Sequence, residues 1–206
     1  MEKKKIPDIV IGRLPLYLRA LQRMLQDGRQ VTSSQELGEI LGISAAQIRK
    51  DLSQFGEFGK QGTGYNIEYL LEQLRKILNL DRIWDMVIIG AGDVGRALAR
   101  YQGFRDRGFQ TKMVFDNDPA KIGQKIDDFQ VLDAAEMVAR VREAGIKVAM
   151  IATPASHAQD VTDKLVKAGV KAILNYAPIR VIAPPDVRLQ YIDPATHLQQ
   201  MSYYLE

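Results

Sequence analysis

The stretch "MVIIGAGDVGRALARY", residues 86–101, decides the fold of this chain. An apolar run passes into a turn that contains Gly90, Gly92 and Gly95, and an amphipathic segment follows the turn. The three glycines satisfy the pattern G-x-G-x-x-G directly after a predicted strand and at the opening of a predicted helix. This arrangement is typical of a Rossmann domain, in which a helix N-terminus binds the phosphates of a dinucleotide.

Each position of this motif has a physical task. Gly90 permits the tight turn, Gly92 lets the backbone approach a pyrophosphate, and Gly95 lets the helix pack closely on the strand. Asp116 follows 21 residues after Gly95, at the end of the next predicted strand. A carboxylate there accepts hydrogen bonds from the adenine-ribose hydroxyls and repels a 2′-phosphate, which favours NAD(H) over NADP(H). The alternative is a glycine turn that only packs a helix on a strand.

After residue 80, apolar runs of strand length alternate with amphipathic helical segments. Such alternation predicts an α/β fold with a doubly wound parallel sheet that is covered by helices on both faces. We expect strands at 86–90, 111–115, 129–132, 147–152, 171–175 and 188–193, and helices at 94–106, 133–144 and 156–168.

The composition of the 206 residues is that of an ordinary globular protein, with 46% hydrophobic and 26% charged residues. The chain has no cysteine, which excludes disulfides, thiolate metal sites and cysteine nucleophiles. No apolar run reaches the length of a membrane span, and the start "MEKKKIPDIV" lacks the apolar core of a signal peptide. We therefore expect a cytoplasmic protein with no membrane partner.

The positive charge is concentrated in the first part of the chain. The net charge is +3, and residues 1–80 hold 12 Lys+Arg against 9 Asp+Glu, whereas residues 81–206 hold 16 of each kind. A surplus of three charges is common on solvated surfaces, so it indicates a nucleic-acid partner only when a binding motif accompanies it.

The first eighty residues predict a helical domain. Leucines at helical spacing from Leu14 to Leu25 predict a first helix, with Pro15 in its first turn. The stretch "VTSSQELGEILGISAAQIRKDLSQFG", residues 31–56, predicts a helix, a tight turn and a second helix. The side chains expected to face the core are Leu37, Ile40 and Leu41 in one helix and Ile48, Leu52 and Phe55 in the other.

This layout is that of a helix-turn-helix, whose second helix presents its early residues to the major groove of DNA. The glycine-rich stretch "GEFGKQGTGYNI", residues 56–67, suits a β-hairpin wing with Lys60 near its tip. The alternative is a solvated helix with basic residues outside. The candidate DNA-binding residues are Ser44, Gln47, Arg49, Lys50, Ser53 and Lys60.

A dehydrogenase remains the main alternative, because a Rossmann domain also serves hydride transfer. Such an enzyme needs a proton donor or acceptor near the nicotinamide, and the chain has only His157 and His197. About a quarter of the chain follows residue 150, and most of it completes the sheet, which leaves no substrate domain. A third possibility is a nucleotide-binding module, for instance for coenzyme A, because "TPASH" at a strand-to-helix turn can also hold phosphate.

Along its whole length the sequence resembles the bacterial Rex family of redox-sensing transcriptional repressors. The motifs that carry the resemblance are "RLPLYLRAL", "TSSQELGEILGISAAQIRKDLSQFGEFGKQGTGYN", "IIGAGDVGRALARY", "VFDNDPAKIGQKI", "AILNYAP" and "YIDPATHLQQMSYYL". The resemblance implies a homodimer, not an enzyme, that binds a palindromic operator when it is free of NADH. It further implies that NADH releases the DNA, whereas NAD+ competes weakly and is compatible with DNA binding.

The resemblance also implies which residues contact the ligands. Positions matching Gln47, Arg49 and Lys50 face the major groove in this family, and the wing enters the minor groove. Tyr101 is expected near the phosphates, and the segments at residues 153–154 and 175–178 near the nicotinamide. The expected nucleotide contacts are Gly90, Ala91, Gly92, Asp93, Val94, Gly95, Tyr101, Asp116, Thr153, Pro154, Asn175, Ala177 and Pro178.

Two positions depart from the family pattern. Gln61 stands in the wing where many members carry arginine, and Pro194 follows "YID" where members often carry leucine or phenylalanine. The last helix carries Leu198, Met201 and Leu205 on one stripe, and in this family the helix is exchanged between subunits.

We expect three functional segments: a winged-helix domain at 1–80, a Rossmann domain at 81–193 and a C-terminal helix at 194–206. We also expect an ion pair between Arg19 and Asp193 that forms in only one state of the dimer and so acts as an allosteric switch.

Overall fold

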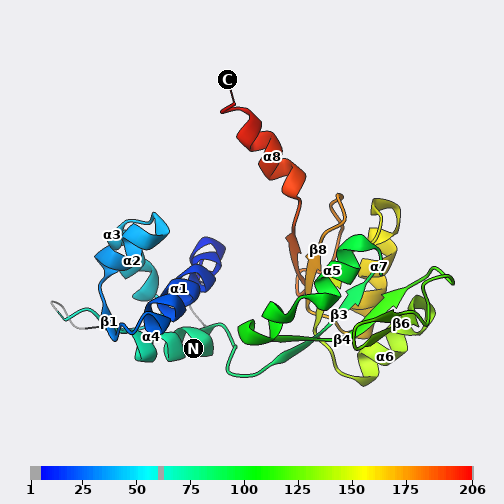
Figure 1. Cartoon of the computed structure of the whole chain (residues 1–206), viewed down its shortest axis with the longest axis horizontal. Coiled ribbons are helices and arrows are strands. Elements are labelled where there is room, and N and C mark those ends of the chain that lie inside the picture. The colour runs from blue at the N-terminus through cyan, green and yellow to red at the C-terminus, as the bar shows by residue number, and fades with distance from the viewer. Residues whose placement is uncertain (1–5, 60–62, 206) are drawn as a thin grey trace. The chain divides into compact units, whose positions relative to one another are not determined.

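The computed structural model describes residues 6–59 and 63–205. The chain divides into two compact units, one ending at Arg82 and the other beginning at Ile83 (Figure 1). Each unit has its own core of buried apolar side chains.

The first unit is mainly helical. Its long helix α1 begins at Asp8, so Pro15 lies inside the helix and not in its first turn, contrary to the sequence prediction. In the core, Leu14 and Tyr17 of α1 pack with residues of three other helices, among them Leu37 and Ile48. The elements are α1 (Asp8–Gln26), β1 (Val31–Thr32), α2 (Ser34–Leu41), α3 (Ala45–Leu52), β2 (Tyr65–Asn66) and α4 (Ile67–Ile77).

The helices α2 and α3 form the predicted helix-turn-helix. A capping box at Ser33 and Glu36 begins α2, and Gly42 ends it in the left-handed conformation, with φ +66°. The side chain of Ser44 then caps α3 by accepting a hydrogen bond from the N–H of Gln47. The prediction that Ile40 lies in the core is wrong. Ile40 lies on the outer face of α2, and 55% of it is exposed.

In the described part of the glycine-rich segment after α3, one strand forms, β2. This strand pairs antiparallel with β1, so that Val31 lies opposite Asn66 and Thr32 opposite Tyr65. Gly64 makes this close approach possible, because a Cβ there would lie 2.4 Å from the carbonyl oxygen of Thr32. The expected tip of the wing, including Lys60 and Gln61, lies outside the described residues.

In the described part of the second unit, seven strands form one sheet in the order β5-β6-β4-β3-β7-β8-β9. All neighbouring pairs are parallel except β5 and β6, which form an antiparallel edge. Without that edge strand, the order is the 3-2-1-4-5-6 arrangement of a Rossmann sheet. The bounds are β3 (Trp84–Ile89), β4 (Phe109–Asp116), β5 (Lys125–Ile126), β6 (Phe129–Asp133), β7 (Val148–Ile151), β8 (Ala172–Asn175) and β9 (Arg188–Tyr191).

Helices cover both faces of this sheet, as the alternation of elements predicts. On one face, α6 and α7 pack on Val87 and Ile89 of β3, and on the other face α5 packs near Met86 and Ile88 (Figure 1). The helices are α5 (Asp93–Arg100), α6 (Met137–Glu143) and α7 (Ala155–Ala168), with 3-10 turns at η1 (Gln102–Arg107) and η2 (Ala134–Glu136).

The helix expected at 94–106 is interrupted. It ends at Arg100 because Tyr101 adopts an extended conformation, after which η1 begins. The ring of Tyr101 packs edge-to-face on Phe104 with 4.8 Å between the ring centroids. The ring contact accompanies the break in the helix.

The last helix, α8 (Pro194–Ser202), has no buried residue. It ends at Ser202, so Leu205, expected on its apolar stripe, lies beyond the helix. All three residues of the expected stripe are open to solvent, with exposed fractions of 65% for Leu198, 61% for Met201 and 81% for Leu205. Among residues 6–59 and 63–205, no helix has the length and apolar character that crossing a membrane requires.

Candidate dinucleotide pocket and DNA-binding helix

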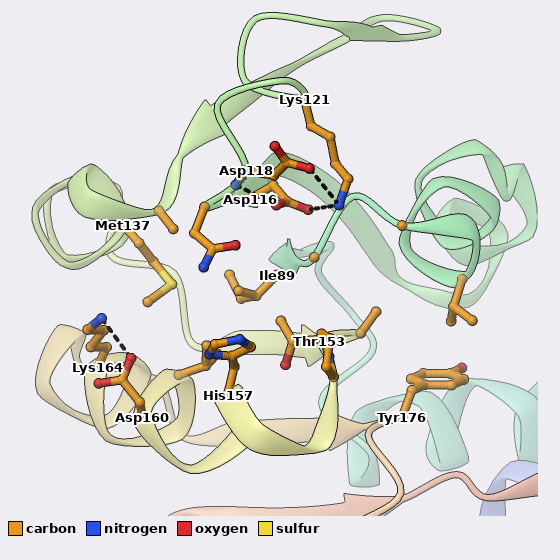
Figure 2. Close-up of a pocket in the computed structure, with 18 of the residues that line it drawn as sticks. Ile89, Asp116, Asp118, Lys121, Met137, Thr153, His157, Asp160, Lys164 and Tyr176 are labelled. Carbon is orange, nitrogen blue, oxygen red and sulfur yellow. Dashed lines mark hydrogen bonds and ion pairs between the residues drawn. The ribbon is translucent and has the colours of Figure 1, made fainter.

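A cavity of about 600 Å³ opens at the carboxyl ends of β3, β4 and β7 in the second unit (Figure 2). This is the edge of an open α/β sheet where ligands bind, next to the point at which the strand order reverses. The lining comprises Ile89, Gly90, Gly92, Asp93, Val94, Asp116, Asn117, Asp118, Lys121, Ala134, Met137, Ala152, Thr153, Pro154, His157, Asp160, Val161, Lys164, Tyr176 and Pro178.

The three glycines of the turn occupy different surroundings. Gly90 has φ +105°, and a Cβ on it would lie 2.5 Å from the carbonyl oxygen of Ala152. A Cβ on Gly95 would lie 1.7 Å from the carbonyl oxygen of Gly90, so the helix packs directly on the turn. Gly92 lines the cavity, and a Cβ on it would meet no described atom within 4 Å. Two glycines therefore serve packing, and the third faces space that a ligand can fill.

Asp116 holds the turn in place from the end of β4. It is 6% exposed, and its carboxylate accepts hydrogen bonds from the backbone N–H groups of Ala91, at 2.6 Å, and Asp118, at 2.9 Å. Burial by itself raises the pKa of Asp116, but these hydrogen bonds and the charge of Lys121 outweigh burial and lower it. The ionised carboxylate keeps acceptor capacity on Oδ1 for a ligand hydroxyl.

Lys121 is a pocket residue that the sequence analysis missed. Its Nζ lies 3.4 Å from Asp116 and 3.6 Å from Asp118, on the side of the cavity opposite Tyr176 (Figure 2). The sequence shows only that Lys121 follows Asp116 by five residues. Whether the lysine side chain points into the cavity depends on the turn between the two residues. Because this cation lies beside Asp116, it weakens the repulsion that Asp116 exerts on a 2′-phosphate.

The segment after β7 brings polar groups to the centre of the cavity. Thr153 Oγ1 is buried and has no hydrogen-bond partner in the described part of the chain. Its neighbours along α7 are His157 and an ion pair at 2.7 Å between Lys164 and Asp160 (Figure 2). A buried hydroxyl without a partner is rare in a folded protein, and here it lines a pocket that has room for a ligand.

Some predicted nucleotide residues do not line this cavity. Asn175 is fully buried, and its side chain binds the N–H of Ala177 at 2.9 Å and the carbonyl oxygen of Ile179 at 2.9 Å. It therefore shapes the loop that carries Tyr176 and Pro178. Tyr101 packs on Phe104 and accepts a hydrogen bond from Arg107. The predicted residues outside the lining are Ala91, Gly95, Tyr101, Asn175 and Ala177.

In the first unit, α3 and its two caps carry five of the six predicted DNA-binding residues. Arg49 and Lys50 are exposed, although Arg49 also donates a hydrogen bond to Ser34 Oγ at 2.8 Å. Ser44 caps the helix, and Ser53 donates a hydrogen bond to the carbonyl oxygen of Lys50. These contacts give α3 a fixed start and leave two cations on its surface.

The side chain of Gln47 donates a hydrogen bond to Asp51, which is completely buried. Asp51 also accepts hydrogen bonds from Arg13 and Tyr17 of α1. Burial alone raises the pKa of Asp51, but the hydrogen bonds from Arg13, Tyr17 and Gln47 outweigh it, so the pKa lies below its ordinary value. The cluster joins α1 to α3 through an ionised carboxylate.

Acidification is expected to destabilise the first unit through Asp51. Because the folded pKa lies below the ordinary value of 3.8, the unfolded chain takes up the proton first. The stability that Asp51 contributes is complete above about pH 5 and is lost as the pH falls through the folded pKa. Thermal unfolding midpoints of the wild type and Asp51→Asn, measured from pH 7 to pH 3, test this. The thermal midpoint of Asp51→Asn should depend less on pH than that of the wild type. If the two midpoints change equally with pH, the prediction is contradicted.

The two residues of the predicted switch lie in different units. Arg19 is exposed on α1. Asp193 caps α8, where its carboxylate accepts hydrogen bonds from Ala195 N and Thr196 Oγ1, both at 3.0 Å. Their pairing stays a prediction. As for metals, no group of three or more His, Cys, Asp or Glu side chains in the described part of the chain is arranged to hold an ion.

Comparisons with known families match both units separately. A family model described as "CoA binding domain" matches residues 81–179, and one described as "Putative DNA-binding protein N-terminus" matches residues 5–53. The first family model covers the Rossmann sheet except its last strand, β9, and the second covers the helices up to the end of α3.

Full-length relatives extend these matches. The redox-sensing transcriptional repressor Rex from Chloroflexus aurantiacus is 52% identical, over 100% of this chain and 97% of that protein. The redox-sensing transcriptional repressor Rex from Carboxydothermus hydrogenoformans is 44% identical, over 98% of this chain and 98% of that protein. A crystal structure of RSP with β-NAD+ and operator DNA has a TM-score of 0.93 and 41% identity, covering 98% of this chain and 93% of that one. RSP with β-NADH has a TM-score of 0.89 and 39% identity, covering 98% and 95%.

Proposed function

Because the chain belongs to the Rex family of redox-sensing transcriptional repressors, we propose that it binds palindromic operator DNA as a homodimer and that NADH releases it. One observation carries the proposal: a single chain joins a helix-turn-helix with exposed Arg49 and Lys50 to a Rossmann pocket that ends at Asp116. We further propose that it acts in the cytoplasm, where bacterial operators lie.

The DNA-binding step uses α3 as the recognition helix. In a dimer, two such helices separated by about one helical turn of DNA reach successive major grooves of a palindrome. Arg49 and Lys50 are exposed on α3 and available for phosphates and base edges. Lys60 lies outside the described residues, and its proposed contact with the minor groove rests on the resemblance to the family alone. Because cations supply much of the affinity, binding is expected to weaken steeply as salt rises.

The nucleotide step uses the cavity of the second unit. The N–H groups at the start of α5 face the pyrophosphate across Gly92, and Asp116 accepts a hydrogen bond from the adenine ribose. Thr153, Pro154 and Pro178 then lie toward the nicotinamide, where the unpartnered hydroxyl of Thr153 gains a partner. NADH is the releasing effector, and NAD+ binds at the same place without releasing DNA.

Coupling between the two steps requires two states of the dimer. We keep the division into a winged helix at 1–80, a Rossmann domain at 81–193 and an exchanged helix at 194–206. NADH stabilises a state in which the recognition helices no longer match the half-site spacing. By linkage, DNA-bound protein binds NADH more weakly than free protein, by the same factor as NADH weakens DNA binding.

A titration of full-length protein on DNA tests this function. A labelled duplex, selected by the protein from a random library, is followed by fluorescence anisotropy during addition of NADH, NAD+ or NADPH. Release by NADH, with little effect of the other two, is expected. If none of the three nucleotides changes DNA binding, the redox function is contradicted. If coenzyme A, added in a parallel titration, releases the DNA, the pocket belongs to that ADP-containing cofactor instead.

An oxidoreductase is the second candidate. The full-length relatives above are named as repressors, and this favours sensing over turnover. Multiple-turnover oxidation of NADH by the purified protein with a small carbonyl substrate, followed at 340 nm, would instead establish an enzyme.

Removing the Arg19 guanidinium is expected to change signalling more than ligand affinity. In Arg19→Ala, the NADH concentration that releases half of the DNA should change about tenfold, while NADH affinity in the absence of DNA stays within about twofold. The physical reason is loss of an ion pair with Asp193 that forms in one state only. Anisotropy and calorimetry measure the two quantities, and Arg23→Ala, one turn away on α1, is the control. If the release curve of Arg19→Ala equals that of the wild type, the predicted ion pair between Arg19 and Asp193 is wrong.

Removing the charge of Asp93 is expected to tighten dinucleotide binding. Its exposed carboxylate lines the cavity in the first turn of α5, where the pyrophosphate should lie. Repulsion between like charges a few ångströms apart in water corresponds to about three- to tenfold in affinity. Calorimetry of NADH with Asp93→Asn at low salt measures the gain. Asp128→Asn, outside the cavity, should leave affinity unchanged, and weaker binding to Asp93→Asn contradicts the expectation.

A further inference from the structure

The candidate base-reading residue Gln47 is held by a buried carboxylate. Its Nε2 donates a hydrogen bond to Asp51 Oδ1 at 2.6 Å, one turn further along α3. An amide that faces a carboxylate must present nitrogen to it, because its own carbonyl oxygen would be repelled. The orientation of the Gln47 amide is therefore fixed by its neighbour.

The carboxylate itself cannot turn away. The Arg13 guanidinium donates to both of its oxygens, from Nε to Oδ2 and from NH2 to Oδ1 at 2.7 Å. Tyr17, also fully buried, donates its hydroxyl to Oδ2 at 2.6 Å. A two-point contact with guanidinium is the most directional pairing that a carboxylate makes. Two side chains of α1 thus fix Asp51, and Asp51 fixes Gln47.

Gln47 is not needed to satisfy Asp51. Without it, the carboxylate still accepts hydrogen bonds from Arg13 and Tyr17, and Gln47 itself is only partly buried. A purely structural role would not require a long amide that reaches back from the DNA-facing side of the helix. The free part of the amide remains one N–H donor and the Oε1 acceptor.

We propose that Asp51 is a positioning residue that holds Gln47 ready to read an adenine, and that this contact determines one base pair in each half-site. The proposal rests on the DNA-binding function proposed above. In the major groove, adenine offers an acceptor at N7 beside a donor at N6, which matches the remaining N–H and Oε1 of the glutamine. Guanine offers acceptors at both N7 and O6, so Oε1 would face O6 and be repelled.

The first test measures which base pair Gln47 reads. Full-length protein without nucleotide selects duplexes from a random library, and affinities are then measured for the preferred duplex and for each single base-pair replacement. The wild type should prefer adenine over guanine about tenfold or more at one position of each half-site. In Gln47→Ala, that preference should disappear while preferences at the other positions remain.

The second test separates positioning from folding. In Asp51→Asn, a neutral amide replaces the charged acceptor that fixes Gln47. The Gln47 amide then loses its single orientation, and the preference for adenine over guanine should fall about tenfold. Combined with Gln47→Ala, Asp51→Asn should have no further effect on base preference. Tyr17→Phe lowers the thermal midpoint but keeps the Gln47 contact, so its base preference should equal that of the wild type.

If Asp51→Asn does not fold, side-chain NMR of the wild type decides the question. One Nε2 proton of Gln47 should be shifted downfield and exchange slowly, because it faces Asp51. Two Nε2 protons that both resonate at the positions of a solvated glutamine amide and exchange rapidly overturn the positioning role, as does a Gln47→Ala variant that weakens all duplexes equally. A wild type that selects no duplex at all instead contradicts the DNA-binding function on which the proposal rests.

Discussion

Gly92→Ala is expected to fold normally and to lose its response to NADH. A Cβ at this position meets no described atom within 4 Å, so the thermal midpoint should remain within about 2 °C of the wild type. The same Cβ lies at the cavity lining, where the backbone must approach the pyrophosphate closely. Overpacking by one methyl group corresponds to a loss of NADH affinity on the order of 10- to 100-fold.

Gly95→Ala is expected to fail in a different way. Its Cβ would overlap the carbonyl oxygen of Gly90 at 1.7 Å, so α5 must move away from the turn. Stability and NADH affinity should then fall together, the first by about 1–3 kcal/mol. The comparison separates a glycine that makes room for a ligand from one that makes room for a helix.

Calorimetry with NADH and thermal unfolding measure both variants. Gly12→Ala is the matched control, because Gly12 also has open space around it but lies on α1 in the other unit. It should leave NADH affinity unchanged and raise the thermal midpoint slightly, because alanine is favoured over glycine inside a helix. If Gly92→Ala binds NADH as tightly as the wild type, the pyrophosphate does not cross this turn, and the dinucleotide interpretation of the cavity is wrong.

The Rossmann fold could be predicted from sequence because its constraints are local. A strand, a glycine turn and a helix follow one another within residues 84–100, and Gly90 and Gly95 are required by close contacts with neighbouring backbone atoms. The helix-turn-helix is local in the same sense, since Ser33 and Ser44 cap its two helices. Periodicity and capping therefore locate the starts of these helices to within a few residues, whereas the end of α5 lies six residues before the expected one.

Contacts between distant residues were beyond sequence reasoning. Arg13 and Tyr17 meet Asp51 across more than thirty residues, so neither spacing nor periodicity joins them. Asn175 follows a strand, as many ligand-binding residues do, yet its side-chain amide is hydrogen-bonded to the backbone of the loop that follows it. The direction in which such a side chain points depends on packing, which one sequence does not reveal.

Disrupting the apolar stripe of α8 is expected to separate the dimer and abolish tight operator binding. The double variant Leu198→Lys/Met201→Lys places two charges on a stripe whose residues are more than 60% exposed in the single chain. A nine-residue helix with no buried side chain is too short to be stable alone, so it requires a partner surface. We expect that surface to belong to the second subunit.

Loss of the dimer removes the gain from binding two half-sites at once. Operator affinity should fall by roughly 10²- to 10⁴-fold, whereas NADH affinity of the separated subunit should change little, because the cavity lies within one unit. Sedimentation velocity measures the oligomeric state, and fluorescence anisotropy measures the affinity for DNA. The control Gln199→Lys/Gln200→Lys adds the same charge to other faces of α8 and should remain dimeric. If the stripe variant also remains a dimer with full operator affinity, α8 does not join the subunits, and the switch through Asp193 must act within one chain.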